Sequence, residues 1–204
     1  MTAAPGRLSV LIVCGSFHLG GSERNVVKIA AGLDPERFMV TVLVFRGEGP
    51  LREELEARGI PIIALDWSFD PRRLWRDFER LQHAIERVSP DILHLFNYPT
   101  IYFALAAGVM AEVPVRLVAI QALDTWKGWT EWITDRLTRS AVTLYLADGE
   151  GARQFVVRQQ GLDPARVRLH YDGPDVEELV SSSPAAALKG HLGLEPDRPV
   201  VGLV

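Results

Sequence analysis

Short apolar runs recur along the chain, and their alternation with helix-like stretches restricts the fold more than any other feature. The runs are rich in Val, Ile and Leu, which is typical of parallel strands buried on both faces. They are Leu8–Cys14, Phe38–Phe45, Pro61–Leu65, Asp91–Phe96, Val115–Ile120, Val142–Leu146 and Val167–His170. Crossover connections between parallel strands are right-handed and lay helices against the sheet. The sequence therefore predicts an α/β fold, a Rossmann-like parallel sheet with helices on both faces.

One helix is marked by five apolar residues at spacings of three and four, which share one helix face. They are Leu74, Phe78, Leu81, Ile85 and Val88. Asp70 followed by Pro71 predicts the start of this helix, because aspartate caps and proline suits the first turn. Arg73, Arg76 and Arg80 lie among acidic residues, which is typical of a solvated face; the alternative is a basic stripe that contacts lipid phosphates.

The end of the chain predicts a change of domain. Residues 1–180 form the predicted amino-terminal domain, and residues 181–198 form a connector rich in Ser, Pro and Gly. Residues 199–204 are predicted to be the first strand of a truncated carboxy-terminal, donor-binding domain.

Composition excludes several classes. The 204 residues, 48% of them hydrophobic, suffice for one good core, and a net charge of -4 gives no general reason to bind nucleic acid. No apolar stretch approaches the ~20 residues of a membrane span, and no secretory leader opens the chain. We expect a cytoplasmic protein; the alternative left open is a protein that is peripheral to the inner face of the membrane. The single Cys14 lies in an apolar run and is interpreted as a buried spectator thiol.

In such sheets ligands bind beyond the carboxyl ends of the strands. In this sequence a glycine-rich loop follows the first predicted strand at that end. Gly20 and Gly21 let a ligand approach the backbone, and the N–H groups of a helix start suit an anion or a sugar edge. The loop lacks both the Gly-x-Gly-x-x-Gly pattern and a P-loop, which disfavours a nicotinamide-dependent dehydrogenase. The alternative is an ordinary glycine turn with Ser22 as the helix cap.

Two polar residues stand at the end of the strand predicted for residues 91–96. His94 is interpreted as a polar contact at a cleft, or alternatively as a hydrogen-bonded structural histidine. Asn97 either presents its amide to a hydroxyl-rich acceptor or closes a turn before Pro99.

Trp126, Trp129 and Trp132 recur three residues apart, so a helix would hold them near one face. Tryptophans with one polar edge suit sugar stacking or a membrane interface. The alternative is packing of this helix onto the sheet, which the apolar pattern continued by Ile133 and Leu137 favours.

Four segments, in order along the chain, resemble motifs of the family 4 glycosyltransferases, which have the GT-B fold. They are Gly20–Arg24 (Gly-Gly-Ser-Glu-Arg), Pro90–His94, Asp148–Arg153 and Asp172–Asp175. The resemblance implies one half of a GT-B two-domain architecture, the acceptor-side half. It also implies retaining transfer of a sugar from a nucleotide sugar to a glycan or lipid-linked acceptor, as in polysaccharide biosynthesis.

The resemblance assigns roles at the predicted cleft. His94 and Gln121 take catalytic positions. The substrate-binding positions are Gly20, Gly21, Ser22, Asn97, Asp124 and Glu150. No metal and no cofactor is expected, since the nucleotide sugar is a substrate. With most donor contacts assigned to the missing carboxy-terminal domain, the 204-residue chain is expected to be inactive alone.

Departures from the family pattern leave a second class of function open. Phe96 stands where the family often has a second histidine, and Gln121 where many members have a titratable histidine. Asp148 and Asp172 each replace a usual serine or asparagine. These changes are consistent with a non-catalytic binding module that keeps the fold.

Overall fold

The computed structural model describes residues 6–123, 125–173, 189–195 and 199. The chain divides into two compact units, Met1–Tyr171 and Asp172–Val204, and the sheet belongs to the first. The predicted connector and the predicted strand at 199–204 lie largely outside the described residues, so the proposed domain boundaries stay predictions.

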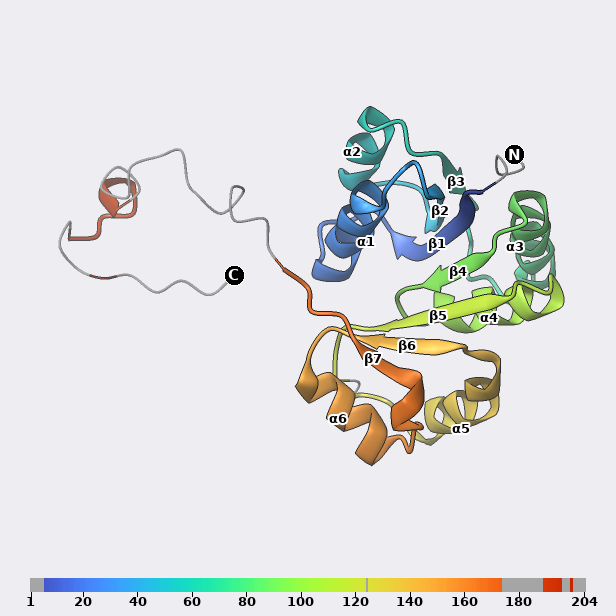
Figure 1. Cartoon of the computed structure of the whole chain (residues 1–204). Helices are drawn as coiled ribbons and strands as arrows, with labels where there is room; N and C mark the ends of the chain where they lie inside the picture. The colour runs from blue at the N-terminus through green and yellow to red at the C-terminus, as the bar shows by residue number, and fades with distance from the viewer. Residues whose placement is uncertain (1–5, 124, 174–188, 196–198, 200–204) are drawn as a thin grey trace. The chain divides into compact units, whose positions relative to one another are not determined.

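Strands and helices alternate along the first unit (Figure 1). The strands are β1 (Leu8–Ser16), β2 (Phe38–Arg46), β3 (Ile62–Ala64), β4 (Ile92–Leu95), β5 (Val115–Ile120), β6 (Leu144–Ala147) and β7 (Val167–Leu169). The helices are α1 (Gly21–Gly32), α2 (Leu51–Ala57), α3 (Leu74–Val88), α4 (Thr100–Met110), α5 (Trp129–Thr138) and α6 (Glu150–Gln159), with short 3-10 turns η1 (Arg139–Ala141) and η2 (Pro164–Arg166). Every predicted apolar run overlaps a strand.

The strands form one parallel sheet in the order β3-β2-β1-β4-β5-β6-β7. Strand β1 lies inside the sheet, with Val13 beside Leu43 of β2 and Leu95 of β4. The chain builds outward from β1 in one direction and then in the other, so the order reverses between β1 and β4. In doubly wound sheets this reversal opens a crevice beyond the carboxyl ends of the two strands.

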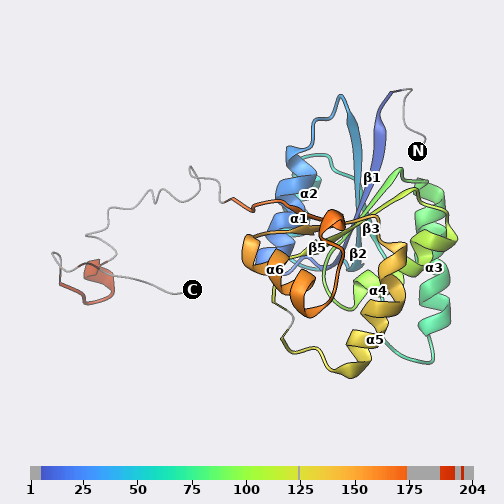
Figure 2. The ribbon, with the colours of Figure 1, turned by 60° about the horizontal axis from the view of Figure 1, so that its bottom comes forward.

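Two hydrophobic cores confirm the prediction of helices on both faces. Val26 of α1 and Leu55 of α2 pack with one set of strand residues. Leu81 of α3, Ala104 of α4 and Val156 of α6 belong to the other core. Figure 2 shows α1 and α2 on one side of the sheet and α3 and α4 on the other. Alternating strand residues point to opposite faces, which is why each run had to be apolar throughout.

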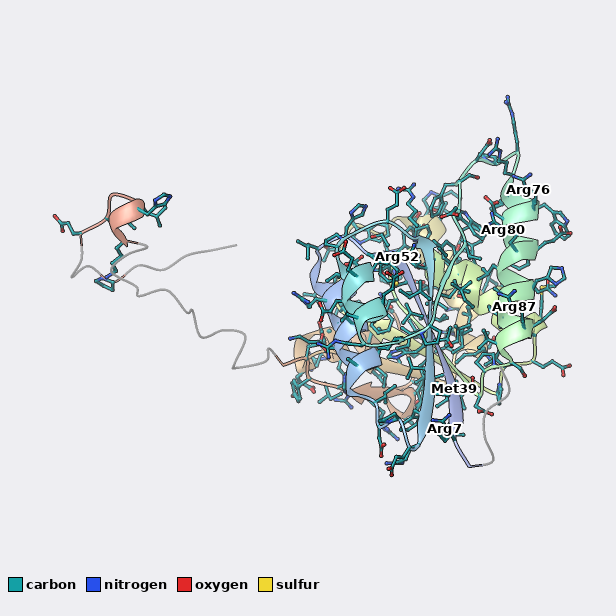
Figure 3. All side chains as sticks on the ribbon, turned by 90° about the horizontal axis from the view of Figure 1, so that it is seen from above. Arg7, Met39, Arg52, Arg76, Arg80 and Arg87 are labelled. Carbon is teal, nitrogen blue, oxygen red and sulfur yellow. The ribbon has the colours of Figure 1, made fainter. Side chains whose placement is uncertain are left out.

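Helix α3 begins at Leu74, so the prediction of a start at Asp70 is wrong. The Asp70 carboxylate accepts the N–H of Arg72 at 2.9 Å and caps a turn that precedes the helix. Figure 3 shows Arg76, Arg80 and Arg87 along α3. Arg80 lies 3.8 Å from the carboxylate of Asp77, and such pairing favours the interpretation of a solvated face of mixed charge.

Asp77 is buried where α3 meets the loop after β3. Its Oδ2 accepts the Ser68 hydroxyl at 2.7 Å and the Ser68 N–H at 3.1 Å. Burial alone would raise the pKa of Asp77, but these hydrogen bonds, with Arg80 and Arg76 nearby, outweigh it and lower the pKa. The carboxylate thus fastens the loop to the helix.

Candidate functional site

Four loops meet at one edge of the sheet, because all neighbouring strands are parallel. They follow β1, β4, β5 and β6. These loops and the first turns of α1 and α6 carry the predicted site residues that the structure describes, except His94. The first two loops emerge side by side at the reversal of strand order.

Asn97 joins the ends of β1 and β4 to the start of α1. Its Oδ1 accepts the N–H of Gly15 at 3.1 Å, and its Nδ2 donates to Oε1 of Glu23 at 3.3 Å. Its backbone is left-handed, with φ of 63°, a conformation that asparagine tolerates better than most residues. One side chain therefore positions the glycine-rich loop.

Two substitutions of Asn97 should separate the contribution of its side-chain hydrogen bonds to stability from that of its left-handed backbone. We expect Asn97→Gly to lower the free energy of unfolding by about 1–2 kcal/mol, because two hydrogen bonds are lost while the left-handed backbone is kept. Asn97→Ala should cost about 1 kcal/mol more, since alanine is strained at positive φ. Urea unfolding measures both; equal stability of the two variants would contradict the backbone argument.

Glu23 is a site residue that the sequence analysis did not single out. It lies in the first turn of α1 and holds the amide of Asn97. The neighbouring Arg24 is 2.5 Å from Glu54 and ties α1 to α2. The only sequence feature that could have identified Glu23 is its place as a first-turn carboxylate inside the Gly20–Arg24 segment.

Gly20 and Gly21 differ in the space around them. Gly20 occupies the N-cap with extended backbone, so the interpretation of Ser22 as the helix cap is wrong. A Cβ on Gly20 would lie 2.4 Å from Oε2 of Glu23, whereas a Cβ on Gly21 would meet no atom within 4 Å. The first turn of α1 is open in front of Gly21.

His94 is buried on β4 beneath this edge. Its ring lies 4.4 Å from that of Phe96, and among the described residues its Nε2 has no hydrogen-bond partner. Burial, with a smaller effect of His170, lowers the pKa of His94 to about 4. The imidazole is therefore neutral near pH 7. The alternative of a hydrogen-bonded structural histidine gains no support from Nε2, for which the described residues offer no hydrogen bond.

A cavity of about 530 Å³ opens beside β5, bounded by α4, α5 and α6. It brings together three predicted site residues: Ser22, Asn97 and Gln121. Gly20, Gly21, His94 and Glu150 do not line it, and Asp124 lies outside the described residues. Glu150 instead accepts hydrogen bonds from Arg153 and Gln154 of its own helix.

One wall of the cavity is an internally compensated polar network. Lys127 Nζ lies 3.0 Å from Oδ2 of Asp135, and the Tyr102 hydroxyl donates to Oδ1 of the same carboxylate. Trp132 donates its Nε1–H to the Lys127 carbonyl at 3.2 Å. Burial raises the pKa of Tyr145 in the same lining to about 12, so its hydroxyl stays protonated. Sequence spacing alone did not indicate this network.

Aromatic rings stand at the mouth of the cavity. Tyr98 and Trp126 both line it, are both exposed, and meet edge to face with ring centroids 4.8 Å apart. Trp126 lies outside α5, so the three tryptophans do not share one helix face. Trp129 is exposed, as is Trp126. The interpretation in which the tryptophan helix packs onto the sheet is therefore wrong for these two residues.

Other chemistry finds little support at this edge. Cys14 is buried, and burial together with Glu23 raises the pKa of its thiol to about 12, which suits the spectator interpretation. Within the described residues, no group of three His, Cys, Asp or Glu could hold a metal ion. No helix in the described part of the chain has both the length and the apolar character to cross a bilayer.

A parallel sheet of this order, with its loops gathered beside a cavity, defines a Rossmann-like domain of the GT-B class. Residues 20–173 match the glycosyl transferase 4-like domain, and the chain belongs to that family. The resemblance drawn from the four motifs is confirmed.

Known proteins of this class are similar over about half their length. EpsF of Bacillus subtilis (strain 168), named as a glycosyltransferase, is 27% identical over 209 residues, covering 96% of this chain and 53% of EpsF. HepE from Anabaena, solved in complex with UDP, superposes with a TM-score of 0.70 at 17% identity, covering 91% of this chain and 50% of HepE.

An epimerase shares the fold as well. The UDP-GlcNAc 2-epimerase from Neisseria meningitidis, solved bound to UDP-GlcNAc, gives a TM-score of 0.54 at 16% identity. It covers 79% of this chain and 45% of the epimerase. Because one fold supports several reactions, the family match and not the fold carries the assignment to glycosyltransferases.

Proposed function

We propose that this domain binds the acceptor of a retaining glycosyltransferase and forms one wall of the cleft in which a nucleotide sugar reacts. The observation that carries the proposal is the family match, which begins at Gly20, just before α1, and spans the loops after β4, β5 and β6. A carboxy-terminal domain would hold most of the donor. The 204-residue chain would then bind substrates without completing transfer.

The acceptor is proposed to enter the cavity beside β5. Tyr98 and Trp126 at its mouth offer ring faces on which a sugar can stack, and Asn97 and Gln121 offer amides to hydroxyl groups. These groups suit a glycan or the sugar portion of a lipid-linked acceptor.

Catalysis would rest on position and electrostatics and not on a titrating base. Gln121 is proposed to orient the reacting hydroxyl, which an amide does through hydrogen bonds alone. The open first turn of α1 at Gly21 would face the donor diphosphate and stabilise its developing charge. The burial of His94 restricts it to an indirect role, the support of the β4 end.

The loop before α1 can be tested with a pair of tryptophan variants. We expect calorimetric titration with UDP and a panel of UDP-sugars to give weak binding that Gly21→Trp abolishes. Gly32→Trp, at the other end of α1 and equally free of nearby atoms, is the matched control and should bind as the wild type does. Equal binding by both variants would remove the donor contact from this loop.

A non-catalytic binding module is the second candidate, and Phe96 favours it. This residue replaces a family histidine and is buried in the core against His94, so it presents no polar group to the cleft. Release of UDP from a UDP-sugar by the parent protein, measured with glycan acceptors, separates the candidates. Donor binding without any UDP release would support the module.

A further inference from the structure

The cavity beside β5 carries more positive than negative charge. Its lining holds three cationic side chains, those of Lys127, Arg136 and Arg139. Asp135 is the one carboxylate among the described lining residues. The chain as a whole has a net charge of -4, so the sign of the charge in the cavity is opposite to that of the molecule. A hollow in which one sign of charge prevails attracts ligands of the other sign.

The carboxylate of Asp135 already has two partners. Its Oδ2 lies 3.0 Å from Nζ of Lys127, and its Oδ1 accepts the hydroxyl of Tyr102. Within the described residues neither Arg136 nor Arg139 forms an ion pair with a carboxylate, and neither guanidinium donates a hydrogen bond. The two arginines therefore supply the excess positive charge.

The two arginines stand where α5 ends and η1 begins. Arg136 is in the last turn of α5, and Arg139 follows three residues later. Residues at this spacing lie on one side of a helix, so the two guanidinium groups can contact one ligand. Helix α5 has no buried residue and leaves space between itself and β5. Figure 2 shows α5 at the periphery of the sheet unit.

Neutral hydrogen-bond donors line the same cavity. They are the hydroxyl of Tyr145 on β6 and the amides of Gln159 and Gln160 at the end of α6. Arg166 and Arg139 both act electrostatically on the Tyr145 hydroxyl, which places it in a region of positive potential. Because this hydroxyl stays protonated, it can donate to an anion together with the amides.

The aromatic rings and the arginines stand at opposite ends of α5. Trp126 precedes the helix, and Arg136 is in its last turn. The helix has 10 residues, and a rise of about 1.5 Å per residue makes it about 15 Å long. A ligand that contacts both ends is therefore longer than one sugar ring.

We propose that the cavity selects an acidic oligosaccharide as the acceptor. The sugar at the reacting end stacks on Trp126 and Tyr98, and a carboxylate farther along the same glycan pairs with Arg136 and Arg139. Guanidinium groups bind carboxylates through paired N–H donors, and apolar lining residues such as Val118 strengthen the pair by excluding water. This inference rests on the proposed function, because it names the substrate class of the same cavity.

The test is calorimetric titration of the 204-residue chain with tetragalacturonate and with its neutral methyl ester. The two ligands differ only in the charge and esterification of their carboxyl groups. We expect the acid to bind at least about tenfold more tightly than the ester, and its affinity to fall as the salt concentration rises. A hyaluronan tetrasaccharide, also compared with its methyl ester, repeats the test with different sugars and linkages.

Three arginine variants locate the site. Arg136→Gln and Arg139→Gln should each weaken binding of the acid by about tenfold and leave binding of the ester unchanged. Arg158→Gln is the matched control and should bind as the wild type does. Arg158 is exposed in the last turn of α6 and does not line the cavity, so this variant loses the same charge elsewhere.

Equal binding of acid and ester would overturn the inference, and so would an equal loss for Arg158→Gln. Failure to bind either acidic tetrasaccharide, by a chain that still binds UDP, would overturn this inference alone and leave the donor contact at Gly21 intact. Geranyl phosphate is the last ligand. If it binds more tightly than both acids and loses affinity in the two cavity variants, the arginines serve a lipid phosphate and the saccharide is wrong.

Discussion

Gly49→Ala should lower the free energy of unfolding by about 3 kcal/mol. Gly49 lies between β2 and α2 with φ of +136°, which L side chains rarely adopt. An added Cβ would lie 2.2 Å from the carbonyl oxygen of Phe17 and 2.8 Å from the nitrogen of His18. Because both atoms are backbone, the loop after β1 must shift, and overpacking of this kind costs about 1–3 kcal/mol in addition to the strain.

Gly59→Ala separates strain from collision. Gly59 has φ of +69°, and a Cβ there would meet no atom within 4 Å. We expect a loss of only about 1 kcal/mol from the left-handed backbone. Urea unfolding compares the two variants, and a loss at Gly49 no greater than that at Gly59 would show that the Phe17 backbone yields without cost. The collision should also weaken any binding that depends on the loop after β1.

Much of the fold was predictable from the sequence, because a parallel sheet covered on both faces needs unbroken apolar strands. The runs at 8–14 and 38–45 lie within β1 and β2, which are buried at their centres. The start of α3 was missed because Asp70 accepts the N–H of Arg72 two residues away and closes a turn there. Local capping chemistry serves turns and helices alike.

The candidate site was only partly predictable. Loop residues such as Asn97 and Gln121 follow strands whose parallel order places them at one edge. The network of Tyr102, Lys127 and Asp135 depends on how α4 packs beside α5, and no spacing in the sequence encodes that approach. The burial of His94 likewise depends on the neighbouring strands and on Phe96.

The buried imidazole of His94 should make the domain less stable in mild acid. In the unfolded chain a histidine has a pKa near 6.5, whereas burial lowers the pKa of His94 to about 4. The unfolded state therefore binds the proton first as the pH falls. This contribution to stability is fully present above pH 6.5 and is lost between pH 6.5 and about 4, by about 3 kcal/mol in total.

Urea unfolding at pH 7.5, 6, 5 and roughly 4 measures this loss, with His94→Leu as the comparison because leucine fills the site without titrating. The variant should show a flatter dependence on pH across this range. Asp77, whose pKa is lowered, acts in the same direction, but its contribution is lost only below its unfolded value of 3.8. The pH range in which His94 loses its contribution to stability therefore lies above the range in which Asp77 loses its own. A wild-type curve as flat as that of the variant between pH 6.5 and 4 would mean that His94 takes up its proton in the folded state as readily as in the unfolded chain, and that burial does not lower its pKa.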